Sequence, residues 1–251
     1  MKLSDKNILI TGASSGIGYA LVKKLAAEKC NLALIARRKE ILDELAGQLK
    51  NTGSKIITFP CDVTIKEEVK RTIDEIVNQF GGIDLAILNS GVSGRSPVKY
   101  YSSDEAKKIF DVNVIGMINC MEILLPHYIK NKKGIIAGVS SLADGRGFPK
   151  SGFYCASKAA ATLILESARI ELMKYNVKVI TIKPGFVKTP MTDKNDFKMP
   201  FLMDVDKAAG IILNGIKKEK RIIQFPLPTV LGAKILKLLP DKIFDFIARR
   251  T

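Results

Sequence analysis

The chain has 251 residues, of which 47% are hydrophobic and 26% charged. Such a composition supplies a substantial apolar core and excludes a disordered or collagen-like chain, and at this length we expect one α/β domain spanning residues 1–251. The formal net charge of +15 is the unusual bulk property; by itself it is compatible with nucleic acid, an anionic membrane or an acidic ligand.

Short apolar runs alternate with segments of helical periodicity along the whole chain. We predict helices from residue 17 and over residues 40–50, 66–80, 104–130, 154–175 and 205–216. We predict strands over residues 7–11, 32–36, 55–59, 84–89, 134–140, 177–183 and 222–225. Continuously apolar strands separated by helices indicate a parallel sheet with helices on both faces, since right-handed crossovers place them there. The predicted fold class is therefore doubly wound α/β.

A glycine-rich turn follows the first predicted strand and reads Thr11-Gly-Ala-Ser-Ser-Gly-Ile-Gly18. Gly12 permits a tight turn, Gly16 lets the backbone approach a pyrophosphate at the helix N-terminus, and Gly18 lets the helix pack on the strand. The spacing differs from the more familiar G-x-G-x-x-G, but the strand-to-helix context is the one that a dinucleotide site requires.

Two arginines, Arg37 and Arg38, follow the second predicted strand. NAD-binding folds usually carry an acidic residue there, which hydrogen-bonds the ribose 2′-hydroxyl. Guanidinium groups instead offer charge-assisted bonds to a 2′-phosphate. The sequence therefore predicts NADP(H) as the cofactor, the alternative being that the two arginines begin a solvated helix.

Tyr154 and Lys158 lie four residues apart, so they are neighbours on one face of the predicted long helix. An adjacent ammonium stabilises a phenolate and brings the pKa of a tyrosine toward the working range of an acid/base group. Ser141, at the end of the preceding strand, would hold the substrate carbonyl. Taken alone, such a pair is more often a surface contact.

These motifs together resemble the classical short-chain dehydrogenase/reductase family over nearly the whole chain. The resemblance is carried, in order, by the glycine turn, Asp62, Asn89-Ser-Gly91, Asn113, Ser141, Tyr154-x-x-x-Lys158, and Pro184-Gly185 with Thr189. Ser90 departs from the family, which usually has alanine there, and the change is too small to abolish binding. Enoyl reductases of this lineage have a longer Tyr to Lys spacing, and the extended, epimerase-like branch has another glycine pattern and a longer chain, so carbonyl/alcohol chemistry is favoured.

The resemblance implies a seven-stranded Rossmann fold and a role for each matching residue. Tyr154 would be the acid/base, Lys158 would lower its pKa and bind the nicotinamide ribose, Ser141 would orient the substrate, and Asn113 would hold a water in the proton relay. The cofactor-binding residues would be Gly12, Ser14, Ser15, Gly16, Ile17, Gly18, Arg37, Arg38, Asp62, Val63, Asn89, Gly91, Tyr154, Lys158, Pro184, Gly185, Val187 and Thr189. Of these, Asp62 and Val63 would touch the adenine, and the last four would line the nicotinamide side.

Two segments near the C-terminus are unusually apolar. The irregular stretch over residues 189–204 has the length of a binding loop and is expected to cover something apolar. Residues 226–251 form a basic amphipathic segment with Val230, Leu231, Ile235, Leu238, Leu239, Ile243, Phe244 and Ile247 at near-helical spacing. Such a stripe more often packs on its own protein or a partner subunit, but it can also lie on an anionic membrane.

Several absences narrow the expected partners. The four cysteines are widely spaced, and we find no export signal and no run of about eighteen uncharged apolar residues, so we predict a cytoplasmic protein with reduced, buried thiols. With a single histidine, His127, which we assign a local structural role, no metal is expected. No nucleic-acid motif is present.

The sequence thus predicts an NADP(H)-dependent oxidoreductase that interconverts a ketone and a secondary alcohol, as a homodimer or homotetramer. The apolar loop and tail favour a lipid-like ketone or 3-oxoacyl group over a small polar ketone or sugar. The alternative of another class is a non-catalytic nucleotide-sensing or scaffold protein on the same fold.

Overall fold

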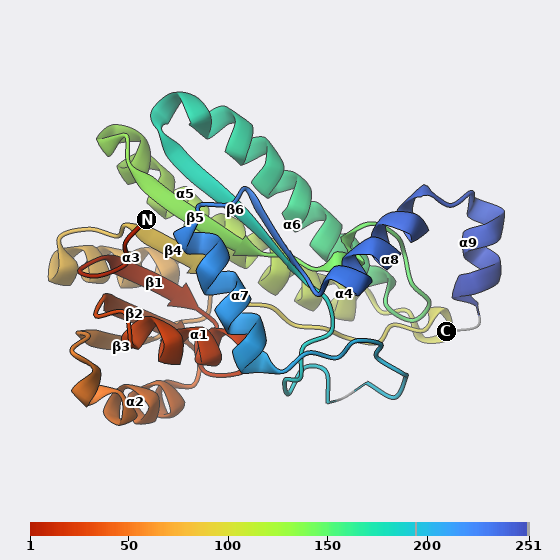
Figure 1. Cartoon of the computed structure of the whole chain (residues 1–251), viewed down its shortest axis with the longest axis horizontal. Coiled ribbons are helices and arrows are strands. Elements are labelled where there is room, and N and C mark those ends of the chain that lie inside the picture. Colours follow the sequence, from red (N-terminus) through yellow and green to blue (C-terminus); the bar gives the residue numbers. More distant parts are fainter. Residues whose placement is uncertain (194, 250–251) are drawn as a thin grey trace.

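A parallel sheet of seven strands, in the order β3-β2-β1-β4-β5-β6-β7, forms the centre of the computed structural model, which describes residues 1–193 and 195–249 (Figure 1). The strands are β1 Asn7–Thr11, β2 Asn31–Ala36, β3 Ile56–Pro60, β4 Leu85–Leu88, β5 Gly134–Val139, β6 Val177–Pro184 and β7 Ile222–Phe225. In the centre of the sheet, Ile10 pairs with Leu34 on one side and with Ile87 on the other. The predicted doubly wound fold is confirmed.

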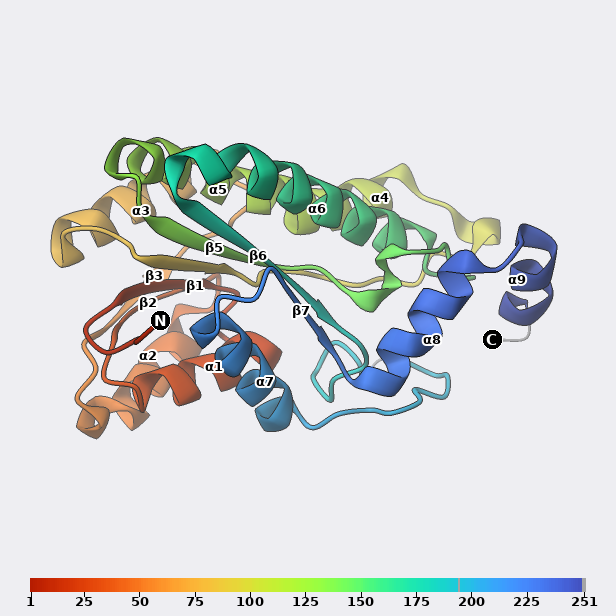
Figure 2. The same cartoon turned by 45° about the horizontal axis from the view of Figure 1, so that its top comes forward.

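Helices cover both faces of the sheet in two layers (Figure 2). One layer contains α1 Gly16–Ala26, α2 Lys39–Gln48 and α7 Val205–Lys217; the other contains α3 Lys66–Phe80, α4 Ser103–Phe110, α5 Gly116–Asn131 and α6 Gly152–Glu171. Leu25 and Ile212 belong to the apolar core on the first face, and Ile73 and Leu165 to that on the second. Short turns of 3-10 helix are η1 Lys50–Thr52, η2 Val98–Tyr100, η4 Leu142–Asp144 and η5 Leu172–Tyr175.

The helix expected over residues 104–130 is divided in the structure. A π-helical turn, η3 Asp111–Ile115, joins α4 to α5. By length and composition alone the stretch Ser103–Asn131 could cross a membrane, and half of its most apolar window is buried inside this fold. A π turn within an α-helix often marks a functional position, and this one carries Asn113.

The C-terminal segment forms two helices, α8 Leu227–Leu238 and α9 Asp241–Ala248. Val230 and Phe244 are buried, as packing on the protein's own body requires. Five members of the predicted stripe are exposed in the part of the chain that the structure describes: Leu231, Ile235, Leu238, Ile243 and Ile247. For these five residues, a partner subunit and a membrane surface stay open as the expected contacts, while Val230 and Phe244 pack on the chain itself.

The strand order reverses direction between β1 and β4, so their carboxyl ends border the crevice where open α/β sheets bind ligands. Residues 189–204 form no helix or strand where the structure describes them, as predicted. Their final part is tied back to the sheet, because Val187 forms a bridge with Met203. The loop therefore borders the carboxyl edge of β6.

Candidate active site

The glycine turn connects β1 to α1. Gly12 and Gly16 have φ angles of +65° and +57°, in the left-handed region that favours glycine. A Cβ on Gly18 would lie 2.3 Å from the Gly12 carbonyl oxygen, so the helix start and the turn are in direct contact. Ser15 is the N-cap of α1 but makes no capping hydrogen bond, and the first turn has no acidic residue. The free N–H groups and positive helix end suit the pyrophosphate of a dinucleotide.

Hydrogen bonds from the end of β4 hold this turn in place. The backbone N–H groups of Asn89 and Ser90 each donate to Thr11 Oγ1 at 3.0 Å. Asn89 Nδ2 donates to the carbonyl oxygens of Thr11 at 3.1 Å and Gly12 at 3.2 Å. Asn89, predicted to bind the cofactor, thus has a direct part in shaping the turn. The Thr11 hydroxyl, to which the sequence pattern assigned no role, connects the two segments.

The two arginines lie beside the glycine turn. Arg38 Nη2 donates to Ser14 Oγ at 3.0 Å, which joins the end of β2 to the turn. Arg37 is exposed, and its Nη1 lies 4.0 Å from Asp62 Oδ2. Val63 is buried, and its carbonyl oxygen accepts a hydrogen bond from Asn119 Nδ2 at 2.9 Å. The structure therefore brings the predicted residues of β2, of the segment after β3 and of the turn to one edge.

Tyr154 and Lys158 lie on the first turns of α6. Lys158 Nζ is 5.9 Å from the centre of the Tyr154 ring and donates to the Val139 carbonyl oxygen at 3.1 Å. Lys158 is only 4% exposed, and this burial lowers the pKa of its ammonium to about 8. Burial also raises the pKa of Tyr154, an effect that a hydrogen bond with Ser141 opposes. In the free protein the ammonium is therefore held in an unfavourable environment that an anion beside it would improve.

Ser141 is the second residue after β5 and is the N-cap of η4. Its Oγ accepts a hydrogen bond from the Ala143 N–H at 3.1 Å, which fixes the side chain. Because a serine hydroxyl has one proton as well as two lone pairs, Ser141 can still donate to another oxygen. The serine thus comes from the start of η4, and the tyrosine and lysine come from α6, the next long helix.

Asn113 is buried in the π turn and fastened to the loop after β4. Its Oδ1 accepts from the Val92 N–H at 2.8 Å, while its Nδ2 donates to the Val92 carbonyl at 2.9 Å and to Ser157 Oγ at 3.0 Å. Asn113 Oδ1 and Lys158 Nζ both lie 3.3 Å from the point where a Cβ on Gly91 would stand. The lack of a side chain at Gly91 therefore leaves room for these two polar groups.

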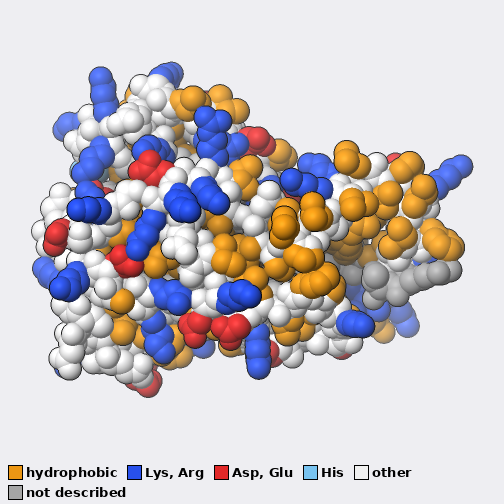
Figure 3. Space-filling view, viewed as in Figure 1, with side chains coloured by type: hydrophobic (Ala, Val, Ile, Leu, Met, Phe, Trp, Pro, Cys, Tyr) orange, Lys and Arg blue, Asp and Glu red, His pale blue; other side chains and the backbone are white. Residues whose placement is uncertain are grey.

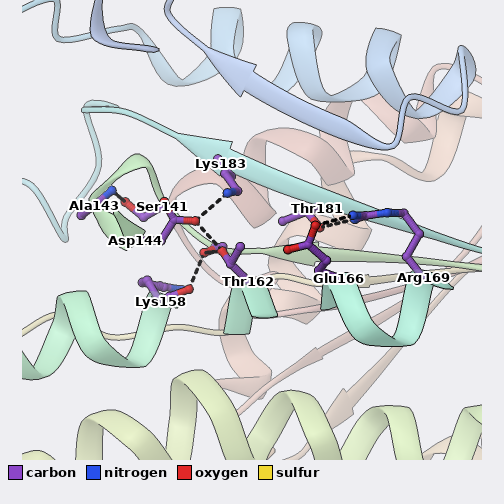
Figure 4. Close-up of polar contacts among 10 residues, drawn as sticks. Ser141, Ala143, Asp144, Lys158, Thr162, Glu166, Arg169, Thr181 and Lys183 are labelled. Carbon is purple, nitrogen blue, oxygen red and sulfur yellow. Dashed lines mark hydrogen bonds and ion pairs between the residues drawn. The ribbon is translucent and has the colours of Figure 1, made fainter. Parts of the chain in front are cut away.

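A chain of polar contacts lies behind these residues (Figure 4). Lys183 Nζ lies 2.7 Å from Asp144 Oδ2, which also accepts from Thr162 Oγ1 at 2.6 Å. Thr162 Oγ1 is 2.7 Å from Ser140 Oγ, and Ser140 donates to the Lys158 carbonyl at 2.8 Å. The chain connects β6, the segment after Ser141 and the helix that carries Lys158. Its members come from separate elements and show no common spacing, so the amino-acid sequence gives no signal for it.

The last group of predicted residues lies after β6. Pro184 ends the strand, and the Gly185 N–H donates to the Phe225 carbonyl at 2.7 Å. A methyl carbon of Thr189 is 3.2 Å from the point where a Cβ on Gly16 would stand, so this segment closes against the glycine turn.

His127 lies on α5 and contacts Asn131 at 3.1 Å, in keeping with a local role.

Two comparisons of sequence agree with this geometry. Residues 6–199 match the short chain dehydrogenase family. An uncharacterized oxidoreductase of Myxococcus xanthus is 34% identical over 249 residues, covering 99% of this chain and 98% of its own. The 3-oxoacyl-(acyl-carrier-protein) reductase of Thermotoga maritima is 31% identical over 194 residues, covering 77% and 79% of the two chains.

Solved structures show the same fold. A short-chain dehydrogenase/reductase from Burkholderia phymatum in complex with NAD has a TM-score of 0.86 at 21% identity, covering 93% of each chain. An alcohol dehydrogenase from Thermococcus sibiricus, complexed with 5-hydroxy-NADP, has a TM-score of 0.79 at 26% identity, covering 88% of this chain and 94% of its own. The glycine turn, the Ser-Tyr-Lys arrangement and these matches together lead to one conclusion: the chain is an oxidoreductase of the classical short-chain dehydrogenase/reductase family.

Proposed function

We propose that this oxidoreductase uses NADP(H) to interconvert an apolar ketone, such as a 3-oxoacyl group, and the corresponding secondary alcohol. The observation that carries the proposal is the position of Tyr154 and the buried Lys158 on α6, next to Ser141 at the end of β5. A tyrosine that acts as acid/base, with a cation and a hydroxyl beside it, can protonate a carbonyl oxygen. A non-catalytic scaffold would not require a desolvated lysine at this place.

When bound, the cofactor would supply the hydride that reaches the carbonyl carbon. Ser141 would donate a hydrogen bond to the carbonyl oxygen, and Tyr154 would donate the proton that completes the alcohol. The Lys158 ammonium would stabilise the phenolate left on Tyr154, which lowers the cost of releasing the proton. Asn113 Oδ1 and Lys158 Nζ, which flank Gly91, would hold the water through which Tyr154 regains a proton. The reverse sequence oxidises the alcohol.

The glycine turn, Asp62, Val63 and residues 184–189 would bind the cofactor, and the arginines would select NADP(H). Arg38 contacts Ser14 in the turn, and Arg37 is 71% exposed and free to rotate toward a phosphate. Both arginines thus follow the end of β2, where residues of this fold contact the adenosine ribose of the cofactor. The alcohol dehydrogenase complexed with 5-hydroxy-NADP supports the assignment of NADP(H). The NAD complex of the Burkholderia protein shows that the same fold also binds NAD.

The loop over residues 189–204 supports an apolar substrate. Phe186 and Phe197 form an edge-to-face pair with ring centres 5.9 Å apart. Arg95, from the loop after β4, forms an ion pair with Asp196 and lies 6.0 Å from the Phe197 ring centre. These contacts join the loop to the segments that follow β4 and β6. The relative that reduces 3-oxoacyl groups on acyl carrier protein supports the same substrate class.

We also infer that the chain is a homo-oligomer and that α6 takes part in the subunit contact. Leu163, Ile170 and Met173 are 64%, 64% and 66% exposed and lie on or directly after this helix. Light scattering coupled to size-exclusion chromatography tests the inference and distinguishes a dimer from a tetramer.

A cytoplasmic location stays a prediction, with which the four buried free cysteines are in keeping.

Cofactor titration by fluorescence tests the proposed NADP(H) preference. The unaltered protein should bind NADPH more tightly than NADH, and the double change Arg37→Asp with Arg38→Asp should remove the difference. Each lost charge-assisted bond weakens NADPH binding by about 1.5 to 3 kcal/mol, or roughly 10- to 150-fold, while NADH binding changes little. Arg71→Asp, at an exposed position on α3, is the matched control.

The same preparations identify the substrate class. NADPH consumption with ketones of increasing chain length should rise with apolar length. Equal affinity for NADPH and NADH in the unaltered protein would contradict the cofactor assignment. A preference for short polar ketones or sugars would contradict the substrate assignment, and no turnover with any ketone would favour a non-catalytic role.

A further inference from the structure

A continuous apolar stripe runs along α8 on the surface of the protein. Leu227, Leu231, Ile235 and Leu238 follow one another at helical spacing and are 68%, 51%, 61% and 83% exposed. On α9, Ile243 and Ile247 add a second exposed pair, 49% and 40% exposed. Figure 3 shows hydrophobic side chains gathered over this end of the molecule. Exposed apolar residues aligned in this way mark a contact surface, whereas single ones do not.

The two helices are held firmly to the body. Arg146 donates to the Leu236 carbonyl at 3.2 Å and to the Leu239 carbonyl, and it lies 2.7 Å from Asp241 Oδ1. Its guanidinium is also 4.7 Å from the centre of the Phe244 ring, which packs edge-on against Phe148. The stripe is therefore displayed in a fixed orientation by the segment that follows Ser141.

Basic residues border the stripe. Lys234, Lys237 and Lys242 are exposed on α8 and α9, as is Arg249 directly after α9, and α8 has no acidic residue. The stem of Lys237 packs against Gly145, 3.6 Å from the point where a Cβ would stand, which leaves its ammonium in solvent. Of the two carboxylates on α9, Asp241 is paired with Arg146 and Asp245 is exposed. The surface is thus apolar with a mainly cationic border, on a chain whose net charge is +15.

We propose that this face of α8 and α9 docks on an anionic membrane surface. An interfacial helix needs an apolar stripe to enter the boundary of the acyl chains and cations to meet the headgroups, and the two helices present both. A symmetric contact with a second copy would place the same patch on both sides, so that the cations around each stripe would face those of the other. Charge complementarity therefore favours lipid over a second copy.

Docking in this way would also orient the crevice. The described part of the loop over residues 189–204 lies near the start of α8 in both Figure 1 and Figure 2. Phe201 and Leu202 in this loop are 60% and 44% exposed. The crevice would then be accessible to a substrate dissolved in the bilayer. This consequence rests on the proposed function, whereas the docking itself does not.

Co-sedimentation with vesicles tests docking without any measurement of activity. The full-length protein should bind vesicles of phosphatidylcholine with phosphatidylglycerol far better than vesicles of phosphatidylcholine alone, and high salt should weaken binding, because exposed charges are screened. The triple change Leu231→Gln, Ile235→Gln and Leu238→Gln should lower the partition coefficient about a hundredfold, since each side chain gains about fivefold from partial burial. The replaced residues are exposed, so thermal melts should stay unchanged.

A second variant isolates the charge. Lys234→Gln with Lys242→Gln should lower partitioning about fivefold per lysine. Lys50→Gln with Lys130→Gln, at exposed positions after α2 and on α5, is the matched control and should bind as the unaltered protein does. Equal binding to anionic and neutral vesicles would overturn the proposal. So would a triple variant that changes oligomeric state in light scattering but binds vesicles as before, because the stripe would then be a subunit contact.

Discussion

Replacement of Lys158 by methionine should make the free protein more stable near neutral pH while it destroys activity. Lys158 is 4% exposed, its ammonium donates a hydrogen bond to the Val139 carbonyl, and burial lowers its pKa to about 8, against 10.5 for an ordinary lysine. The folded protein therefore holds this proton less tightly than the unfolded chain does. Below pH 8 the side chain is protonated in both the folded and the unfolded state, so burial of the charge lowers the free energy of unfolding by its full amount.

The size of the effect follows from the two pKa values. A difference of about 2.5 between them corresponds to about 3 kcal/mol of lost stability at pH 7. As pH rises above 8 the buried amine loses its proton first, so the penalty shrinks to about 1 kcal/mol at pH 10. The methionine variant has no such penalty. Loss of the hydrogen bond to Val139 costs about 1 to 2 kcal/mol at every pH, so the net gain at pH 7 is about 1 to 2 kcal/mol.

Urea unfolding of both proteins at pH 7 and pH 10 measures these quantities. The stability of the variant relative to the unaltered protein should fall by about 2 to 3 kcal/mol between the two pH values, and this change does not depend on how well methionine packs. Lys130→Met, at an exposed position on α5, should show no such pH dependence. A difference between Lys158→Met and the unaltered protein that stays constant from pH 7 to pH 10 would refute the assignment of a desolvated ammonium.

Two further predictions concern the same region. Tyr154→Phe should lower kcat by about 10²- to 10⁴-fold by removing the proton donor, with the Kd for NADPH nearly unchanged; a variant that kept most of its kcat in steady-state assays would exclude Tyr154 as the acid. Asp144→Asn and Lys183→Met should each lower the free energy of unfolding in urea by about 2 to 3 kcal/mol. Either change leaves the charge of the other residue unpaired, and the side chains of Asp144 and Lys183 are only 11% and 18% exposed. The double variant should cost clearly less than the sum of the two, and additive losses would show that the pair is not coupled.

The sequence by itself determined the fold and the principal motifs. Strands β1 and β7 and helix α3 begin and end where the apolar runs and helical periodicity indicated. These features are local: a buried parallel strand must be apolar on both faces, and a glycine turn between strand and helix must have glycine at positions with positive φ. Tyr154 and Lys158 were also within reach of sequence reasoning, because a helix brings residues four apart to one face.

Only the tertiary structure decided how distant residues meet. No spacing could indicate that Lys183 of β6 pairs with Asp144, that Thr11 accepts hydrogen bonds from residues 89 and 90, or that Arg38 reaches Ser14. The same holds for α8, whose periodicity predicted an apolar stripe but not whether the chain covers it. Periodicity indicates which residues share a face, whereas burial depends on what lies opposite that face, and in the described chain Leu231, Ile235 and Leu238 stay 51%, 61% and 83% exposed.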